Sequence, residues 1–261
     1  MLTESFWQRF IPFRKAAPAK QDTCFWQVDI HSHLLPDLDD GVNSLEETLI
    51  CLKQLADWGI HKVVTTPHVS RDWYPNGTST IQESLTAVQD LIIEHELPLT
   101  IEVAAEYLLD DFFMESLNKG DLLAFGEKRY LLIETGWSAP PFGLDDMIFR
   151  IQTHGYTPVL AHPERYKYYH ADKDKPTLGH LREAGCLFQL NWMSLCGRYG
   201  SQVEKQARYL LQNAWVDFIG SDMHRSKDIS TMTRLFNSAD IKLLEEQPLL
   251  NMSLLTDVKQ P

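Results

Sequence analysis

The stretch VDIHSHLLPDLDDG, Val28 to Gly41, ends a short apolar run with two histidines one residue apart and continues with acidic residues. On an extended chain the side chains at positions i and i+2 point to the same face, so His31 and His33 can converge on one point. One interpretation is a pair of metal ligands, and the other is two ordinary histidines at a strand end. The choice depends on how the other strands of the chain end.

Six further β-rich runs follow this one, and helical stretches separate them. The seven runs are FWQVDIH (25–31), HKVVTTPH (61–68), LTIEVAAEY (99–107), RYLLIETG (129–136), YTPVLAHPE (156–164), CLFQLNW (186–192) and VDFIGSDMH (216–224). Short strands that alternate with helices favour a parallel sheet built from βα units. The sequence therefore predicts an α/β fold.

Local signals also predict where helices begin and end. Ser44 and Glu47 have the spacing of a capping box ahead of an apolar stripe, and Thr80 with Glu83 repeats that spacing. Three glycines stand where a helix should stop before the next strand: Gly59, Gly155 and Gly185. Because no repeat or interior linker interrupts the pattern, we expect one domain over residues 26–261.

The composition is that of an ordinary globular protein with an acidic surface. The 261 residues, 44% of them hydrophobic, can fill a large core, and the formal charge of −12 argues against nucleic acid as a partner. No run approaches the roughly 20 apolar residues of a membrane-spanning helix. The four cysteines contain no CxxC pair, which predicts reduced thiols in a cytoplasmic protein: Cys24, Cys51, Cys186 and Cys196.

Residues 1–25 differ from the rest of the chain, because aromatic and basic side chains alternate there. Such a segment could lie on the inner membrane surface or dock on a partner protein, which would make the protein peripheral to the membrane. The alternative is a tail that packs on its own domain or stays loose, since Pro12 interrupts any helix. We treat residues 1–25 as an N-terminal extension.

Six of the seven predicted strands end in a residue that can bind a metal ion. In parallel α/β barrels the loops after the strands share one face, so these side chains would meet there. Imidazole and carboxylate ligands without clustered thiolates suit zinc, manganese or iron. Nine candidate ligands are too many for one ion and predict two or three: His31, His33, Asp40, His68, Glu106, Glu134, His162, Asp222 and His224.

With these residues in place, the chain resembles the PHP (polymerase and histidinol phosphatase) superfamily, and within it the bacterial metal-dependent protein-tyrosine phosphatases of capsule and exopolysaccharide synthesis. The resemblance runs in matching order from about Val28 to about Ile241. It rests on DIHSHLLPDLDDG (29–41), TPH (66–68), AAEY (104–107), LIET (132–135), AHPERY (161–166) and GSDMH (220–224). It implies a distorted (β/α)7 TIM-like barrel. It also implies bound divalent ions, with manganese as the preferred ion and iron, zinc or magnesium as alternatives.

The resemblance also implies roles for individual residues. His31 and His33 would bind one ion, and Glu134 would bridge toward a second ion held partly by His162. The other five candidate ligands would complete the sites. Arg165 falls where the family places a phosphate-contacting arginine, so the expected catalytic residues are Arg165, His162 and His224. A second family arginine has only two imperfect candidates here, Arg225 and Lys227.

The expected activity is hydrolysis of phosphotyrosine, on a membrane-associated bacterial tyrosine kinase that controls capsule synthesis. Metal ions can activate water and stabilise charge on phosphoryl oxygens, and Arg165 would hold the non-bridging oxygens. A thiol mechanism would need the Cys-x5-Arg pattern of cysteine-dependent phosphatases. The residues six positions after the four cysteines are instead Ile30, Asp57, Trp192 and Gln202.

Two other functions remain open at this stage. A small-molecule phosphatase, similar to the PHP-type histidinol phosphatases, would use the same cluster with a closed and specific pocket. A non-catalytic, metal-stabilised interaction module would need no open coordination sites, and the full set of ligands argues against it.

Overall fold

The computed structural model describes residues 23–170 and 177–255, and all neighbouring strands in this part of the chain pair in parallel. One sheet has the order β1-β2-β4 and the other the order β3-β5-β6-β7-β8-β9. The strands are β1 (Val28–Asp29), β2 (Lys62–Thr65), β3 (His68–Val69), β4 (Thr100–Val103), β5 (Glu106–Leu108), β6 (Tyr130–Glu134), β7 (Thr157–Ala161), β8 (Leu187–Asn191) and β9 (Phe218–Gly220). The predicted parallel α/β fold is confirmed.

Nine strands rather than seven arise because the second and third predicted strands are each broken in two. Residues 66–67 separate β2 from β3, and residues 104–105 separate β4 from β5. Pro67 has no N–H to donate to a ladder, but its carbonyl accepts from Glu106 N at 3.1 Å. Beyond the breaks, His68 is paired with Glu106 in the second sheet. Two predicted ligands thereby become direct neighbours.

The two sheets are joined between β1 and β9 by contacts outside a regular ladder. The buried Asn251 side chain donates to the carbonyl oxygens of Val28 (2.8 Å) and Ile219 (2.7 Å), and it accepts from Ile219 N (3.1 Å). Past the strand ends, Ser32 and Met223 form an isolated parallel bridge. The segments that follow the first and last strands therefore lie side by side.

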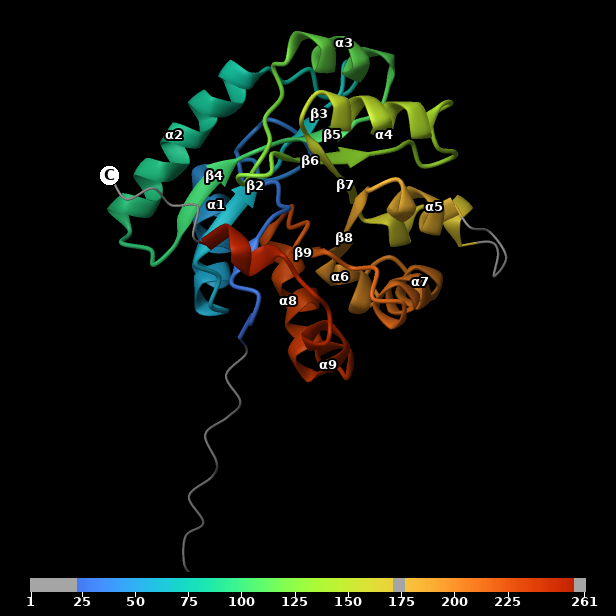
Figure 1. The fold of residues 1–261 in the computed structure, drawn as a ribbon. Coiled ribbons are helices and arrows are strands. Elements are labelled where there is room, and N and C mark those ends of the chain that lie inside the picture. Colours follow the sequence, from blue (N-terminus) through green and yellow to red (C-terminus); the bar gives the residue numbers. More distant parts are fainter. Residues whose placement is uncertain (1–22, 171–176, 256–261) are drawn as a thin grey trace, which may run out of the picture.

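Helices lie around the outside of the strands (Figure 1). The α-helices are α1 (Leu45–Asp57), α2 (Thr78–Glu94), α3 (Asp111–Lys119), α4 (Leu144–Thr153), α5 (Thr177–Glu183), α6 (Trp192–Leu195), α7 (Ser201–Gln212), α8 (Ile229–Met232) and α9 (Asp240–Glu245). Short 3-10 helices are η1 (Pro163–Arg165), η2 (Lys167–Tyr169), η3 (Ser226–Asp228), η4 (Thr233–Asn237) and η5 (Asn251–Leu255). No helix in the described part of the chain is both long enough and apolar enough to cross a membrane.

The helix starts agree with the sequence at α1 and differ at α2. Ser44 is the N-cap of α1, and its Oγ accepts from Glu47 N at 3.3 Å, as predicted. The predicted cap at Thr80 is wrong, because α2 already begins at Thr78 with Gly77 as its N-cap and no side-chain cap bond. The predicted glycine ends are confirmed, since three glycines have positive φ: Gly59, Gly155 and Gly185.

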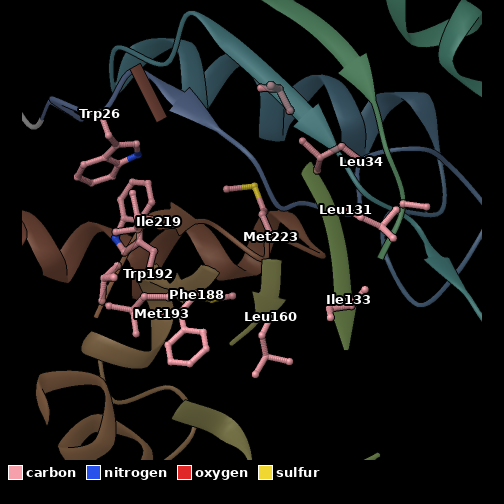
Figure 2. Packing of buried hydrophobic residues seen from close by; sticks show 14 of the residues in the cluster. Trp26, Leu34, Leu131, Ile133, Leu160, Phe188, Trp192, Met193, Ile219 and Met223 are labelled. Atoms are coloured by element: carbon pink, nitrogen blue, oxygen red, sulfur yellow. The ribbon is translucent and has the colours of Figure 1, made fainter. Parts of the chain in front are cut away.

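The core between strands and helices is filled by large apolar side chains (Figure 2). Trp26 and Trp192 meet edge to face with ring centroids 5.2 Å apart, and Phe188 and Ile219 are fully buried. Burial of each such side chain contributes about 1.5–3 kcal/mol to stability. Because this packing locks the strands, the loops at their carboxyl ends start from rigid positions.

The predicted extension lies mostly outside the described residues, which begin at 23. Cys24 is buried, and its N–H donates to Trp58 O at 2.7 Å. The Phe25 ring meets Trp26 at 5.1 Å, so these two residues pack on the domain. The division at residue 25 and the docking role of the extension stay predictions.

Candidate metal centre

All nine predicted ligands lie together in one cluster. The predicted position at a strand end is wrong for His68 and Glu106, which begin β3 and β5 because the second and third predicted strands are broken just before them. The nine ligands form four overlapping groups, and within each group one ligand atom per residue lies within 4.8 Å of the others. The groups are His33, Asp40, His68 and His224; His31, His33 and Asp222; His31, Glu106 and His162; and His68, Glu106 and Glu134. The sequence places these residues up to almost 200 positions apart, so the fold creates the cluster.

Glu106 is at the centre of the cluster and is fully buried. Its Oε2 lies 3.1 Å from His31 Nε2 and 3.2 Å from His68 Nδ1, and its Oε1 lies 2.8 Å from His162 Nε2. The start of β5, next to the break after β4, points this carboxylate at three imidazoles. Glu106 can therefore contact ions held in different parts of the cluster.

The backbone is left-handed at two predicted ligands. His162 has φ 35° and Asp222 has φ 50°, a region that residues other than glycine rarely adopt. Such a conformation costs on the order of 1–3 kcal/mol and persists where the surroundings impose it. Here it turns both side chains toward the cluster directly after β7 and β9.

Two glycines allow the chain to pass close to the first histidines. A Cβ on Gly41 would lie 2.3 Å from His33 O, and a Cβ on Gly220 would lie 2.6 Å from His31 Cβ. Both distances are too short for any side chain, so only glycine allows this approach. The loop after β1 and the end of β9 can then enclose the cluster.

Two side chains that the sequence analysis missed orient the paired histidines. Asp39 Oδ2 lies 2.7 Å from His33 Nδ1, and Gln189 Oε1 lies 2.8 Å from His31 Nδ1. Because both oxygens can only accept, each Nδ1 carries a proton, which leaves Nε2 as the ring nitrogen that could bind an ion. The two Nε2 atoms, 3.3 Å apart, face the cluster. The sequence does single out Gln189, because it is the one polar residue within the otherwise apolar run from Leu187 to Leu190.

The pKa shifts in the cluster show which of its side chains are charged. Burial opposes ionisation of Glu106, but the surrounding imidazoles, His31 first, hold its pKa well below its usual range. Burial likewise opposes protonation of His68, yet the Glu106 carboxylate raises the pKa of His68 to about 9. Burial lowers the pKa of His162 to about 4, which leaves a neutral imidazole. Buried carboxylates beside imidazoles fit divalent cations, which compete with protons for such sites.

The outer side of the cluster is more open. Asp40 has a side chain that is 58% exposed, and its Oδ1 lies 3.4 Å from His224 Nε2 and 3.6 Å from His68 Nε2. Glu134 Oε1 lies 3.1 Å from His68 Nδ1. These ligands border the space from which a substrate would approach.

Arg165 stands beside the cluster at the end of η1. Its Nη1 donates to Asp222 Oδ2 at 2.8 Å, and its guanidinium carbon lies 4.6 Å from the Trp137 ring and 4.3 Å from the Tyr199 ring. Burial opposes its charge, but Asp222 and its other neighbours raise the pKa of Arg165. Arg165 is therefore charged, held in place and partly accessible. The sequence analysis did not identify Tyr199, which also donates to Asp222 Oδ2 at 3.2 Å.

A cavity of about 360 Å³ opens over the cluster. Its walls include Glu134, His162, Asp222, His224 and Arg165, and its rim carries Trp73 and Trp137. These indoles are 77% and 53% exposed. Neither candidate for a second arginine lines this cavity, and Arg225 instead pairs with Glu47 at 3.3 Å.

None of the four cysteines lines this cavity or belongs to the groups of candidate ligands. Three of the four are buried, and burial raises the pKa of Cys51, Cys186 and Cys196 to about 12. A protonated thiol is a poor nucleophile. We expect iodoacetamide to leave aryl phosphate hydrolysis unchanged under native conditions, while a divalent-metal chelator abolishes it. Inactivation by alkylation with full activity in the chelator would contradict a metal-based mechanism.

The fold and the site define a parallel α/β protein with a polynuclear candidate metal centre. Residues 27–240 match the model of the family described as capsular polysaccharide synthesis, CpsB/CapC. The chain belongs to this family.

Relatives and solved structures agree with this assignment. CapC of Staphylococcus aureus is 31% identical over 84% of this chain and 86% of its own length. The tyrosine-protein phosphatase CpsB of Streptococcus pneumoniae is 30% identical over 76% of this chain and 82% of its own. The fold also matches one of the crystal structures of YwqE from Bacillus subtilis and CpsB from Streptococcus pneumoniae, which are described as metal-dependent tyrosine phosphatases. The TM-score is 0.75 at 27% identity, and the match covers 88% of this chain and 91% of the other. The predicted class, a tyrosine phosphatase of the capsule-synthesis type, is confirmed.

Proposed function

We propose that the cluster holds two or three divalent ions, with manganese as the preferred ion, and that it hydrolyses phosphotyrosine on a protein substrate. The observation that carries this proposal is the convergence of nine imidazole and carboxylate side chains in one cluster, six of which line a cavity together with Arg165. Bound divalent ions would stabilise charge on the phosphoryl oxygens and activate a water molecule. The ligands are His31, His33, Asp40, His68, Glu106, Glu134, His162, Asp222 and His224.

The protein groups around the ions position the phosphate. Arg165 offers the free donors of its planar guanidinium to two non-bridging oxygens while Asp222 fixes its orientation. Trp137 stacks on the His162 ring with centroids 5.7 Å apart and planes within 15°, and it shields that side of the site from water. His162 and His224 line the same cavity and would be among the residues that hold the ions beside the phosphate. A phenol with a pKa near 10 leaves with little proton assistance, so no general acid is required.

The rim of the cavity favours an aryl phosphate. Trp73 and Trp137 present exposed indole faces beside the cluster, and an aromatic ring of the substrate can stack on them. A serine phosphate would leave both rings exposed and would have a poorer leaving group. The site therefore favours phosphotyrosine over phosphoserine.

Matched peptides test this substrate class. We expect a phosphotyrosyl peptide to have a kcat/KM at least about 100-fold above that of the phosphoseryl peptide of otherwise identical sequence, because the leaving group and the ring contacts both act in the transition state. Trp73→Ala should raise KM for the phosphotyrosyl peptide several-fold. Higher kcat/KM for histidinol phosphate would favour the small-molecule phosphatase, and metal binding without turnover of any monoester would favour the interaction module.

We also propose that the two sheets are parts of a distorted (β/α)7 TIM-like barrel of the PHP type; the Asn251 hydrogen bonds that link β1 to β9 support this. The physiological substrate is a membrane-associated bacterial tyrosine kinase that controls capsule or exopolysaccharide synthesis, and the enzyme works in the cytoplasm close to the inner membrane. Phosphotyrosine analysis of that kinase in cells with and without this protein tests the assignment.

A further inference from the structure

A second cavity of about 330 Å³ lies directly beside the first. The wall that the two cavities share consists of Asp40, Arg165, Asp222 and His224. The other polar residues that line the second cavity are Arg198, Tyr199, Arg225, Lys227 and Asp228. The proposed hydrolysis uses none of the three cations among these last five residues.

Charge is distributed unevenly in this second cavity. Four cationic side chains line it against three carboxylates. Two of these carboxylates, Asp40 and Asp222, are candidate metal ligands, so bound ions would neutralise them. The third, Asp228, is buried and accepts from His224 N at 3.3 Å and Arg225 N at 3.0 Å. The metal-loaded enzyme therefore has an excess of positive charge there.

Two of the cations are free enough to bind a ligand. Lys227 is exposed and forms no ion pair with any residue among those the structure describes. Arg198 has a side chain that is 44% exposed and touches Asp228 through one nitrogen at 3.5 Å, which leaves most of its donors available. Arg165 and Arg225, by contrast, are held by Asp222 and Glu47.

We propose that this second cavity is a subsite for an acidic side chain of the substrate protein that lies near the phosphotyrosine in sequence, with Lys227 and Arg198 as its main contacts. The proposal rests on the proposed function, because the phosphotyrosine in the first cavity sets where its neighbours lie. An extended chain advances about 3.3 Å per residue, so residues up to about three positions away reach a cavity that shares a wall with the first. A carboxylate there accepts charge-assisted hydrogen bonds from both cations.

A pair of peptides tests the subsite on the metal-loaded full chain. One phosphotyrosyl peptide carries Asp and Glu at the three positions on each side of the phosphotyrosine, and the other carries Asn and Gln there. We expect kcat/KM to be about two- to fivefold higher per engaged charge for the acidic peptide at low salt. This ratio should fall toward one as the ionic strength approaches 1 M, because salt screens exposed charges.

Variants locate the effect. Lys227→Gln and Arg198→Gln should each reduce the acidic-to-neutral ratio, and Lys227→Glu should invert it. Lys128→Gln removes the same charge from an exposed position just before β6, at the strand end opposite the cluster, and should leave the ratio unchanged. Equal losses on both peptides in Lys227→Gln would show a general phosphate clamp and overturn the subsite. If the unmodified chain hydrolysed the acidic and the neutral phosphotyrosyl peptide equally well, the subsite alone would be overturned. If it hydrolysed neither of them but did hydrolyse a phosphoseryl peptide, both the subsite and the proposed function would be overturned.

Discussion

We expect Glu106→Gln to lower kcat for an aryl phosphate by about 1,000-fold or more and to reduce the metal content of the purified protein. Glu106 lies within 3.2 Å of three imidazoles, so its charge is shared by more candidate ligands than that of any other carboxylate in the cluster. Glutamine keeps the shape of the side chain but removes its negative charge, and it places an amide donor against the imidazole nitrogens that we propose as metal ligands. A metal position contributes several kcal/mol of charge stabilisation in the transition state, which corresponds to this loss.

Elemental analysis and turnover, measured on the same preparations, check the result. Asp37→Asn is the control, because it likewise replaces a carboxylate by an amide, but at an exposed residue of the 31–41 segment with φ 58°, where asparagine is well tolerated. We expect this control to keep both metal and activity. If Glu106→Gln retained full metal content and normal kcat, the central role of Glu106 would be wrong.

The overall site was predictable because each strand end is a local feature. Glu134 follows an apolar run directly, and His162 does the same one strand later, so each could be assigned from its own segment. Parallel strands bring such ends to one edge without any further information. Most of the cluster therefore followed from the strand ends, whereas Asp40 lies in the loop after β1, and His68 and Glu106 begin new strands.

The breaks within two strands were not predictable in the same way. Residues Ala104 and Ala105 have nothing that ends a strand locally, yet β4 stops before them and β5 begins after them. The reason is the choice of partner, since β4 pairs with β2 and β5 pairs with β6. Such pairing depends on residues tens of positions away, which a local pattern cannot report.

The orienting residues show a second limit. Asp39 and Asp40 are neighbours with the same side chain, but Asp39 is partly buried against His33 while Asp40 is exposed beside His224. Their different roles follow from the turn of the loop, which includes the left-handed residue Asp37. The sequence shows that carboxylates follow His31 and His33 closely, but it does not show that Asp39 orients His33 while Asp40 faces the cavity.

We expect Arg165→Ala to lower kcat/KM for a phosphotyrosyl peptide by about 100- to 1,000-fold, the range seen when one donor to a developing oxyanion is removed. Arg165→Lys keeps the charge but loses the planar pair of donors, so we expect a smaller loss, mainly in kcat. Steady-state kinetics on both variants separates the two contributions. Arg150→Ala is the matched control, because Arg150 is a half-exposed arginine on α4 whose ion pair is with Asp146 in the same helix.

Chemical rescue distinguishes a phosphate contact from a structural role. Loss of Arg165 leaves a space between the Trp137 and Tyr199 rings, which now enclose the guanidinium at 4.6 and 4.3 Å. Free guanidinium ions can enter this space and donate to the same oxygens, so millimolar guanidinium should restore part of the activity of Arg165→Ala and none of that of Glu106→Gln. Without rescue and with a lowered melting temperature, Arg165 would act by holding Asp222 in place, and the phosphate would be bound by the ions alone.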